Sequence, residues 1–139
     1  MNTANTIPAP ADFFREEQAN GASFEAEEIY NDTVAYLNSI NALHVVPIAL
    51  IYQYAANTAR WIQCEHLTSQ NGLVIGSEDG GLKRNPAISL SLQYGKRAGD
   101  VLEQISRITK AHQAERDADT NIFKDTVERL HTARNTDDF

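Results

Sequence analysis

The feature that most constrains the fold is an apolar stripe that runs from residue 87 to residue 108. Its members recur at steps of three and four residues, the spacing of one helix face: Ala87, Leu90, Tyr94, Ala98, Val101, Ile105 and Ile108. Asn85 and Pro86 stand directly before the stripe, where an N-cap and a first helical residue belong. A helix that continues to about His112 is on the order of 40 Å long. The stripe therefore predicts a long helix whose apolar face is covered by a partner.

Two shorter helices and a β insertion are predicted before the long helix. One helix follows Phe24 and carries the stripe Ala26, Tyr30, Val34, Leu37 and Ile40. The next begins at Pro47, ends near Gln70 and carries the stripe Ile48, Ile51, Ala55, Thr58 and Ile62. Glycine-rich turns then surround a β-branched segment at about residues 71–84, which predicts a short strand or β-hairpin. The fold class is thus mainly α, a helical hairpin and a long third helix with a β insertion.

The 139 residues are expected to form one compact domain with two extensions. Residues 1–22 contain Pro8 and Pro10, and they predict a flexible N-terminal arm that Phe13 and Phe14 tether. Residues 23–118 are expected to form the helical core and oligomerisation domain. The polar segment AERDADT is expected to separate this core from a C-terminal helix and acidic tail at 119–139, with the apolar positions Ile122, Phe123, Val127 and Leu130.

Composition excludes several classes of protein. The chain is 42% apolar and 22% charged, which is ordinary for a folded globular protein. No stretch approaches the length of a membrane span, and no secretory signal opens the chain, so we expect a soluble protein without a membrane partner. Cys64 is the single cysteine, so no intrachain disulfide forms and a reducing compartment is expected.

Catalytic and metal-binding motifs are not evident. The glycine-rich segment GSEDGG lacks the Gly-Lys-Ser/Thr ending of a phosphate-binding loop. Cys64 and His66 are two residues apart, but the other histidines lie on separate segments without ligand spacing. We therefore expect no catalytic residue, no metal and no cofactor, and hence a protein that is not an enzyme.

Charge is divided unevenly along the chain. Residues 1–42 hold seven acids and one base, a net charge of −6, whereas residues 83–110 hold six bases and two acids, a net charge of +4. The six bases are candidate DNA contacts: Lys83, Arg84, Lys96, Arg97, Arg107 and Lys110. Lys83 and Arg84 precede a helix N-terminus, where free amides and the helix dipole favour an anion such as phosphate. A solvated, non-binding face is the alternative for all six.

Gly95 and Gly99 lie inside the predicted long helix, one turn apart. Each costs about 1 kcal/mol relative to alanine in a helix interior. Close approach of another helix, from the same chain or a neighbouring subunit, would explain them. A helix that breaks near Gly95 is the competing explanation.

Four segments of the chain form a recognisable series: YNDTVAYL (30–37), YQYAANTARW (52–61), GLVIG (72–76) and KRNPAISLSLQYGKRAGDVLEQI (83–105). Together they resemble the short, helical phage terminase small subunits. In that family a similar Asn-Pro-Ala step opens a long helix after a glycine-containing hairpin. Many relatives continue with a Gly-Leu-Thr-Pro-like segment, which this chain lacks.

The resemblance implies a non-enzymatic subunit of a viral genome-packaging motor in the host cytoplasm. Such a subunit assembles into a homo-oligomeric ring, binds the packaging-initiation site on double-stranded viral DNA and presents it to the large terminase. The ring contacts are expected from the long helix: Leu90, Tyr94, Ala98, Val101, Ile105 and Ile108. The segment from about 119 to 139 is the candidate for docking the large subunit.

Two other readings remain open. The first is a DNA-binding regulator in which the first two helices form a helix-turn-helix, with Gln53, Asn57, Arg60 and Gln63 as its recognition face. The second is an oligomeric adaptor that does not bind nucleic acid and uses the long helix only for assembly.

Overall fold

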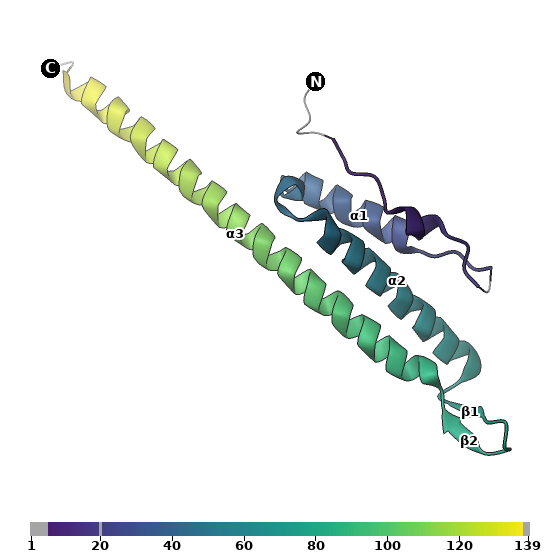
Figure 1. Ribbon diagram of the computed structural model, residues 1–139. Coiled ribbons are helices and arrows are strands. Elements are labelled where there is room, and N and C mark those ends of the chain that lie inside the picture. The colour runs from purple at the N-terminus through teal and green to yellow at the C-terminus, as the bar shows by residue number, and fades with distance from the viewer. Residues whose placement is uncertain (1–5, 20, 138–139) are drawn as a thin grey trace.

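A computed structural model describes residues 6–19 and 21–137 and shows three helices and one β-hairpin (Figure 1). The elements in chain order are η2 (Asp12–Arg15), α1 (Ala26–Ser39), η3 (Leu43–Val45), α2 (Ile48–Asn71), β1 (Val74–Gly76), β2 (Leu82–Arg84) and α3 (Pro86–Asp137). The predicted fold class is confirmed. Residues 1–5 and 20 of the expected arm, residues 138–139 of the expected tail, and the side chains of Phe123 and of residues 133–137 lie outside what the structure describes.

Helices α1 and α2 form an antiparallel hairpin, and α3 returns along α2 (Figure 1). Asn41 ends α1 in the left-handed conformation, with φ of 56°, which a short polar side chain tolerates better than most. The amide of Ala42 then donates to the carbonyl of Leu37 at 2.9 Å, which satisfies one of the last carbonyls of the helix. Pro47 precedes the first turn of α2 as its N-cap.

The core lies where the three apolar stripes meet. From α1 it contains Tyr30, Val34 and Leu37, and from α2 it contains Ile51, Ala55 and Ala59. Helix α3 contributes Val101 and Ile105, which are 6% and 3% exposed. Since all three helices supply the core at three- and four-residue steps, the helix faces predicted from the sequence are the ones that pack.

The N-terminal segment packs against this core. Phe14 is 2% exposed and meets the ring of Tyr52 edge to face at 5.7 Å. Two tyrosine hydroxyls hold the backbone before it: Tyr30 donates to the carbonyl of Pro8 at 2.5 Å and Tyr52 to that of Ala9 at 2.7 Å. The described part of the expected flexible arm is therefore anchored, because it supplies an aromatic side chain and two acceptors that the core uses. Phe13, 44% exposed, contributes less to this contact than Phe14.

An ion pair closes the same segment over α1. Arg15 donates to Glu27 at 2.8 Å. The hydrogen bond from Arg15 lowers the pKa of Glu27, and the same partner raises the pKa of Arg15. Both groups are close to solvent, so the pair fixes the geometry of the segment more than it stabilises the fold.

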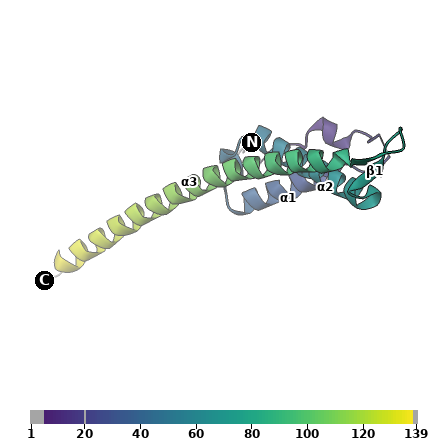
Figure 2. The same cartoon turned by 90° about the horizontal axis from the view of Figure 1, so that it is seen from below.

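Helix α3 is a single helix of 52 residues. The expected interruption at AERDADT and the separate C-terminal helix were wrong. This segment is polar but contains neither glycine nor proline, and its alanines, glutamate and arginine are good helix formers. Polarity on all sides marks a helix that has left the core and continues in solvent. The second half of α3 accordingly projects past the other two helices (Figure 2).

Candidate nucleic-acid interface

Asn85 joins the β-hairpin to α3 and uses most of its hydrogen-bonding capacity to do so. Its side-chain oxygen accepts from the amide of Ala87 at 3.0 Å, and its side-chain nitrogen donates to the carbonyl of Gly72 at 2.9 Å. Its backbone amide donates to the carbonyl of Leu73 at 2.9 Å. The predicted N-cap is confirmed. The same residue links the segment before β1 to the start of α3, so the position of the hairpin relative to α3 is fixed.

The first-turn amides of α3 are not free for an anion. Pro86 has no amide hydrogen, the amide of Ala87 donates to the side chain of Asn85, and that of Ile88 donates to the carbonyl of Asn85 at 3.0 Å. The phosphate site expected at this helix N-terminus therefore lacks its backbone donors. What remains is the pair of cations on β2.

Lys83 and Arg84 are exposed on opposite faces of the hairpin. Lys83 lies opposite Ile75, and Arg84 lies opposite Val74. Because consecutive residues of a strand point to opposite sides, the two cations cannot converge on one phosphate. Neither forms an ion pair within the described residues. They offer one free cation on each side of the hairpin stem.

The hairpin tip has the opposite charge. Glu78 is exposed, and Asp79 accepts from the hydroxyl of Ser77 and, at 3.2 Å, from the amide of Gly81. These hydrogen bonds, the one from Ser77 foremost, lower the pKa of Asp79. A polyanion would be repelled by this tip and attracted by the stem, so within the hairpin the stem is the candidate for DNA contact.

The four remaining cations lie on α3 and do not form one group. Lys96, Arg107 and Lys110 fall within about 60° of one another on the outer face, over roughly 21 Å of helix. Arg107 is paired with Glu103 at 2.6 Å on that face. Arg97 is turned to one side, with its guanidinium 5.8 Å from the centre of the Tyr94 ring. The six expected DNA contacts thus occupy the hairpin, an outer row on α3 and a separate position at Arg97.

The residues expected to join subunits are largely used inside the chain. Val101 and Ile105 are buried against α1 and α2, and Ile108 packs against the same cluster. Tyr94 and Ala98 are half-buried, and only Leu90 is exposed, at 44%. The partner that the stripe required is α2 of the same chain, which the sequence could not distinguish from a neighbouring subunit.

The two glycines of α3 have different surroundings. A Cβ added at Gly95 would lie 3.1 Å from Cδ1 of Trp61, so the indole approaches the helix backbone there. A Cβ added at Gly99 would meet nothing within 4 Å. Close approach within the fold therefore explains Gly95 and not Gly99. The helix runs unbroken through both positions.

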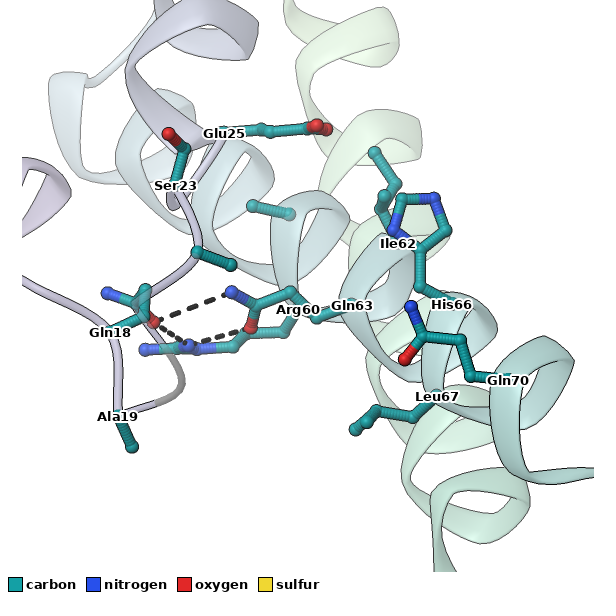
Figure 3. A pocket seen from close by; sticks show the side chains of 12 residues that line it. Gln18, Ala19, Ser23, Glu25, Arg60, Ile62, Gln63, His66, Leu67 and Gln70 are labelled. Atoms are coloured by element: carbon teal, nitrogen blue, oxygen red, sulfur yellow. Dashed lines mark hydrogen bonds between the residues drawn. The ribbon is translucent and has the colours of Figure 1, made fainter.

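Arg60 and Gln63, two of the four residues expected on the recognition face of a helix-turn-helix regulator, are bonded to Gln18 of the same chain. Arg60 donates to Gln18 at 2.7 Å and to Gln63 at 2.8 Å (Figure 3), and its guanidinium lies 4.2 Å from the centre of the Phe24 ring. Helices α1 and α2 also lie side by side and antiparallel, unlike the steeply crossed pair of a helix-turn-helix (Figure 1). The geometry gives no support to this alternative.

Figure 3 also shows a cavity of about 530 Å³ between the N-terminal segment and α2. Gln18, Arg60, Gln63 and His66 line it, and three of these four are bonded to one another. Burial raises the pKa of the nearby Cys64 thiol, which makes it a poor nucleophile. Within residues 6–19 and 21–137, no group of three or more metal-ligating side chains occurs. No helix in that part of the chain is long and apolar enough to span a bilayer.

These features define a small helical protein with an acidic first helix, a basic hairpin stem and a basic outer row on its longest helix. A family model for the small subunit of phage terminase matches residues 26–115, more than half of the chain. The chain therefore belongs to the phage terminase small-subunit family, and this family gives it a role in phage genome packaging. The match covers α1, α2, the hairpin and the packed part of α3. Searches of curated proteins and of solved structures found no match.

Proposed function

We propose that the protein is the non-catalytic DNA-recognition subunit of a packaging motor in the host cytoplasm. It binds the packaging-initiation site on double-stranded viral DNA as a ring of identical subunits and presents that DNA to the large terminase, which carries the ATPase and the nuclease. Family membership supports the packaging role. The observation that carries the DNA contact is the hairpin stem, where two cations that form no ion pair with the residues the structure describes are exposed on an anchored strand.

The stem suits contact with a phosphate backbone for a physical reason. Asn85 fixes it to α3, so Lys83 and Arg84 are presented with little backbone freedom to lose on binding. Since the two side chains leave opposite faces of the ribbon, they reach different phosphates rather than one. Contact of this kind positions DNA without reading its bases, and its affinity depends steeply on salt.

The projecting half of α3 is the proposed docking element for the large terminase. Ile122, Val127 and Leu130 are 65%, 48% and 67% exposed there. In the described part of the chain no other element reaches them (Figure 1). An amphipathic helix with uncovered apolar side chains is a common ligand for a groove on another protein.

Salt-dependent binding to a fragment of viral DNA tests the proposal. In the double variant Lys83→Ala/Arg84→Ala we expect affinity to fall and the slope of log K against log [salt] to become shallower by about 1.8, since each neutralised phosphate contributes about 0.9. The matched control is Lys124→Ala/Arg129→Ala, which removes two exposed cations from the projecting half and leaves the slope unchanged. An unaltered slope in the hairpin variant removes the stem from the DNA site. A wild-type protein that binds no DNA even at low salt favours the adaptor.

Binding to purified large terminase tests the docking element separately. We expect Ile122→Asp/Leu130→Asp to abolish this interaction and to leave DNA affinity unchanged, because the hairpin lies at the other end of α3. Retained large-subunit binding would place the docking site elsewhere.

A further inference from the structure

Helix α3 carries a second apolar stripe beside the one that faces the core. Its members are Ile88, Leu92, Gly95, Gly99, Leu102 and Ser106, spaced by four, three, four, three and four residues. The second stripe is turned by about one residue, or about 100°, from the core stripe. Leu92 is 67% exposed and Leu102 is 44% exposed. Trp61 of α2 stands at its edge, 41% exposed, and packs over Gly95.

The second stripe has the shape of a helix-packing surface without its helix. Gly99 lies at its middle and has open space where a side chain would stand. A glycine costs the helix about 1 kcal/mol there, and no contact within the fold accounts for that cost. Leu102 lies one turn after this opening, and Leu92 lies two turns before it, beyond Gly95. An incoming helix could approach the backbone at Gly99 and bury both leucines.

A row of cations borders the second stripe on its outer side. Lys96, Arg107 and Lys110 lie on the adjacent part of the helix surface, in the position that flanking charges occupy in a coiled coil. The helix that fits this surface therefore has an apolar centre and an acidic edge.

The outer face of α1 carries a row of acidic side chains that ends in one exposed aromatic side chain. Glu25, Glu28 and Asp32 recur at three and four residues on the side of α1 that faces away from the core, and they form no ion pair within the described residues. Tyr36 shares this face and is 63% exposed. Glu27, which is paired with Arg15, lies outside it.

We propose that the acidic outer face of α1 in one copy docks on the second stripe of α3 in the next copy. This inference rests on the proposed function and identifies the surfaces that would join the ring. Tyr36 covers the opening beside Gly99, and the acids of α1 meet Lys96, Arg107 and Lys110. Because the two surfaces belong to different helices, each docked pair leaves one α1 face and one α3 face free. Such a head-to-tail contact continues until the ring closes.

DNA is the competing occupant of this face. Glu103 lies among the three cations and is bonded to Arg107. Asp100 is exposed on the same side of α3. Both carboxylates repel phosphate, and the leucines and Trp61 offer DNA nothing that would offset their burial. The balance of charge and apolar surface favours a protein helix.

The mass of the purified protein in solution, by light scattering, tests the contact. We expect Gly99→Leu to reduce the assembly to single chains, since the leucine fills the space that the neighbouring helix needs. Its melting temperature in the single-chain form is not expected to fall, because that space is open in the monomer. The matched control is Gln104→Leu, which adds the same side chain at an exposed position outside the second stripe and is expected to leave assembly intact.

Charge exchange tests the orientation. Lys96→Glu/Lys110→Glu and Glu28→Lys/Asp32→Lys are each expected to dissociate the assembly, and the chain that carries all four changes is expected to regain it. A one-to-one mixture of the two double variants is also expected to assemble, with the two chains alternating, because the acidic α1 of one variant meets the basic α3 of the other, and the basic α1 of the second meets the acidic α3 of the first. A four-fold variant that stays dissociated, or a Gly99→Leu protein that assembles as the wild type does, overturns the proposal.

The outcomes separate this inference from the function on which it rests. A wild-type protein that binds DNA but remains a single chain removes the contact and keeps DNA recognition. A protein that assembles through this contact and binds no DNA keeps the contact and removes DNA recognition. If Gly99→Leu assembles normally and loses DNA affinity, the second stripe belongs to DNA and the inference is wrong.

Discussion

The two halves of α3 form one continuous helix but are held in different ways. From Pro86 to about His112 the helix lies against α2, and its core stripe is buried or half-buried along most of its length. Its last contacts with the α1–α2 turn are His112 Nε2, 3.1 Å from the carbonyl oxygen of Asn41, and Arg116, which donates to the carbonyl of Ile40 at 3.4 Å. Every described side chain after these is exposed. Packing therefore determines the first half, whereas local helix propensity maintains the second.

The largest expected difference comes from placing a charge in each half. Ile105→Asp puts a carboxylate into the core at a side chain that is 3% exposed, and we expect it to lower the free energy of unfolding by about 4 kcal/mol. Leu130→Asp, at a position 67% exposed, is expected to change it by less than about 0.5 kcal/mol. Urea denaturation followed by circular dichroism measures both. Equal losses would show that the second half is packed in solution.

The second prediction concerns the cap at the start of the packed half. Asn85→Ala removes the N-cap bond to Ala87 and leaves the carbonyl of Gly72 without its donor, so we expect a loss of about 2 kcal/mol. Asn121→Ala in the projecting half is the control. It lies exposed in the helix, where alanine is the better helix former, and we expect no loss. If the urea concentration at the unfolding midpoint is the same for Asn85→Ala as for the wild type, the junction does not stabilise the fold.

The third prediction concerns the two glycines in the packed half of α3. Gly99→Ala is expected to raise the free energy of unfolding by about 1 kcal/mol, since its Cβ enters open space. Gly95→Ala is expected to gain less, because its Cβ lies 3.1 Å from Trp61 and the indole must shift. The variants are compared at one protein concentration, since any assembly contributes to apparent stability. A larger gain at Gly95 than at Gly99 would contradict the assigned contacts.

The smallest expected effect concerns the exposed ion pair between Arg15 and Glu27. The pKa of Glu27 is lowered in the folded protein, so its pair with Arg15 stabilises the fold at neutral pH, and this contribution is lost as the pH falls through the lowered value. Glu27→Gln is expected to melt slightly below the wild type at pH 7, and the two melting curves are expected to converge under acid conditions. A difference that persists at pH 2 would show that the glutamate acts by packing instead.

Local signals in the sequence were sufficient for most of the fold. The three core stripes, the turn glycines around β1 and the Asn-Pro start of α3 each act through neighbouring residues, so they can be read without knowledge of the rest of the chain. The end of α3 was misread because a polar segment is as compatible with a solvated helix as with a loop. The docking of Phe14 was only partly foreseen, since it depends on contacts with tyrosines far along the chain.

The candidate site was less accessible to sequence reasoning. The six cations predicted as DNA contacts are all exposed, but their division among the hairpin faces and the helix surface depends on strand alternation and helix register. Gly95 and Gly99 look alike in the sequence. Their surroundings differ because Trp61, which belongs to another helix, packs over Gly95. The core stripe could not reveal whether its partner was α2 or another subunit, because both would require the same residues.

The unbroken length of α3 also has a mechanical consequence. At 1.5 Å per residue the helix is on the order of 78 Å long, and roughly the last two fifths of it, some 30 Å, extend past Arg116 and its contact with the α1–α2 turn. It therefore acts as a lever whose pivot is the packed half. A tilt of about 5° at the pivot sweeps the free end through about 3 Å, roughly the distance between successive base pairs of DNA. Small rearrangements where the hairpin meets α3 are thus amplified at the far end of the molecule.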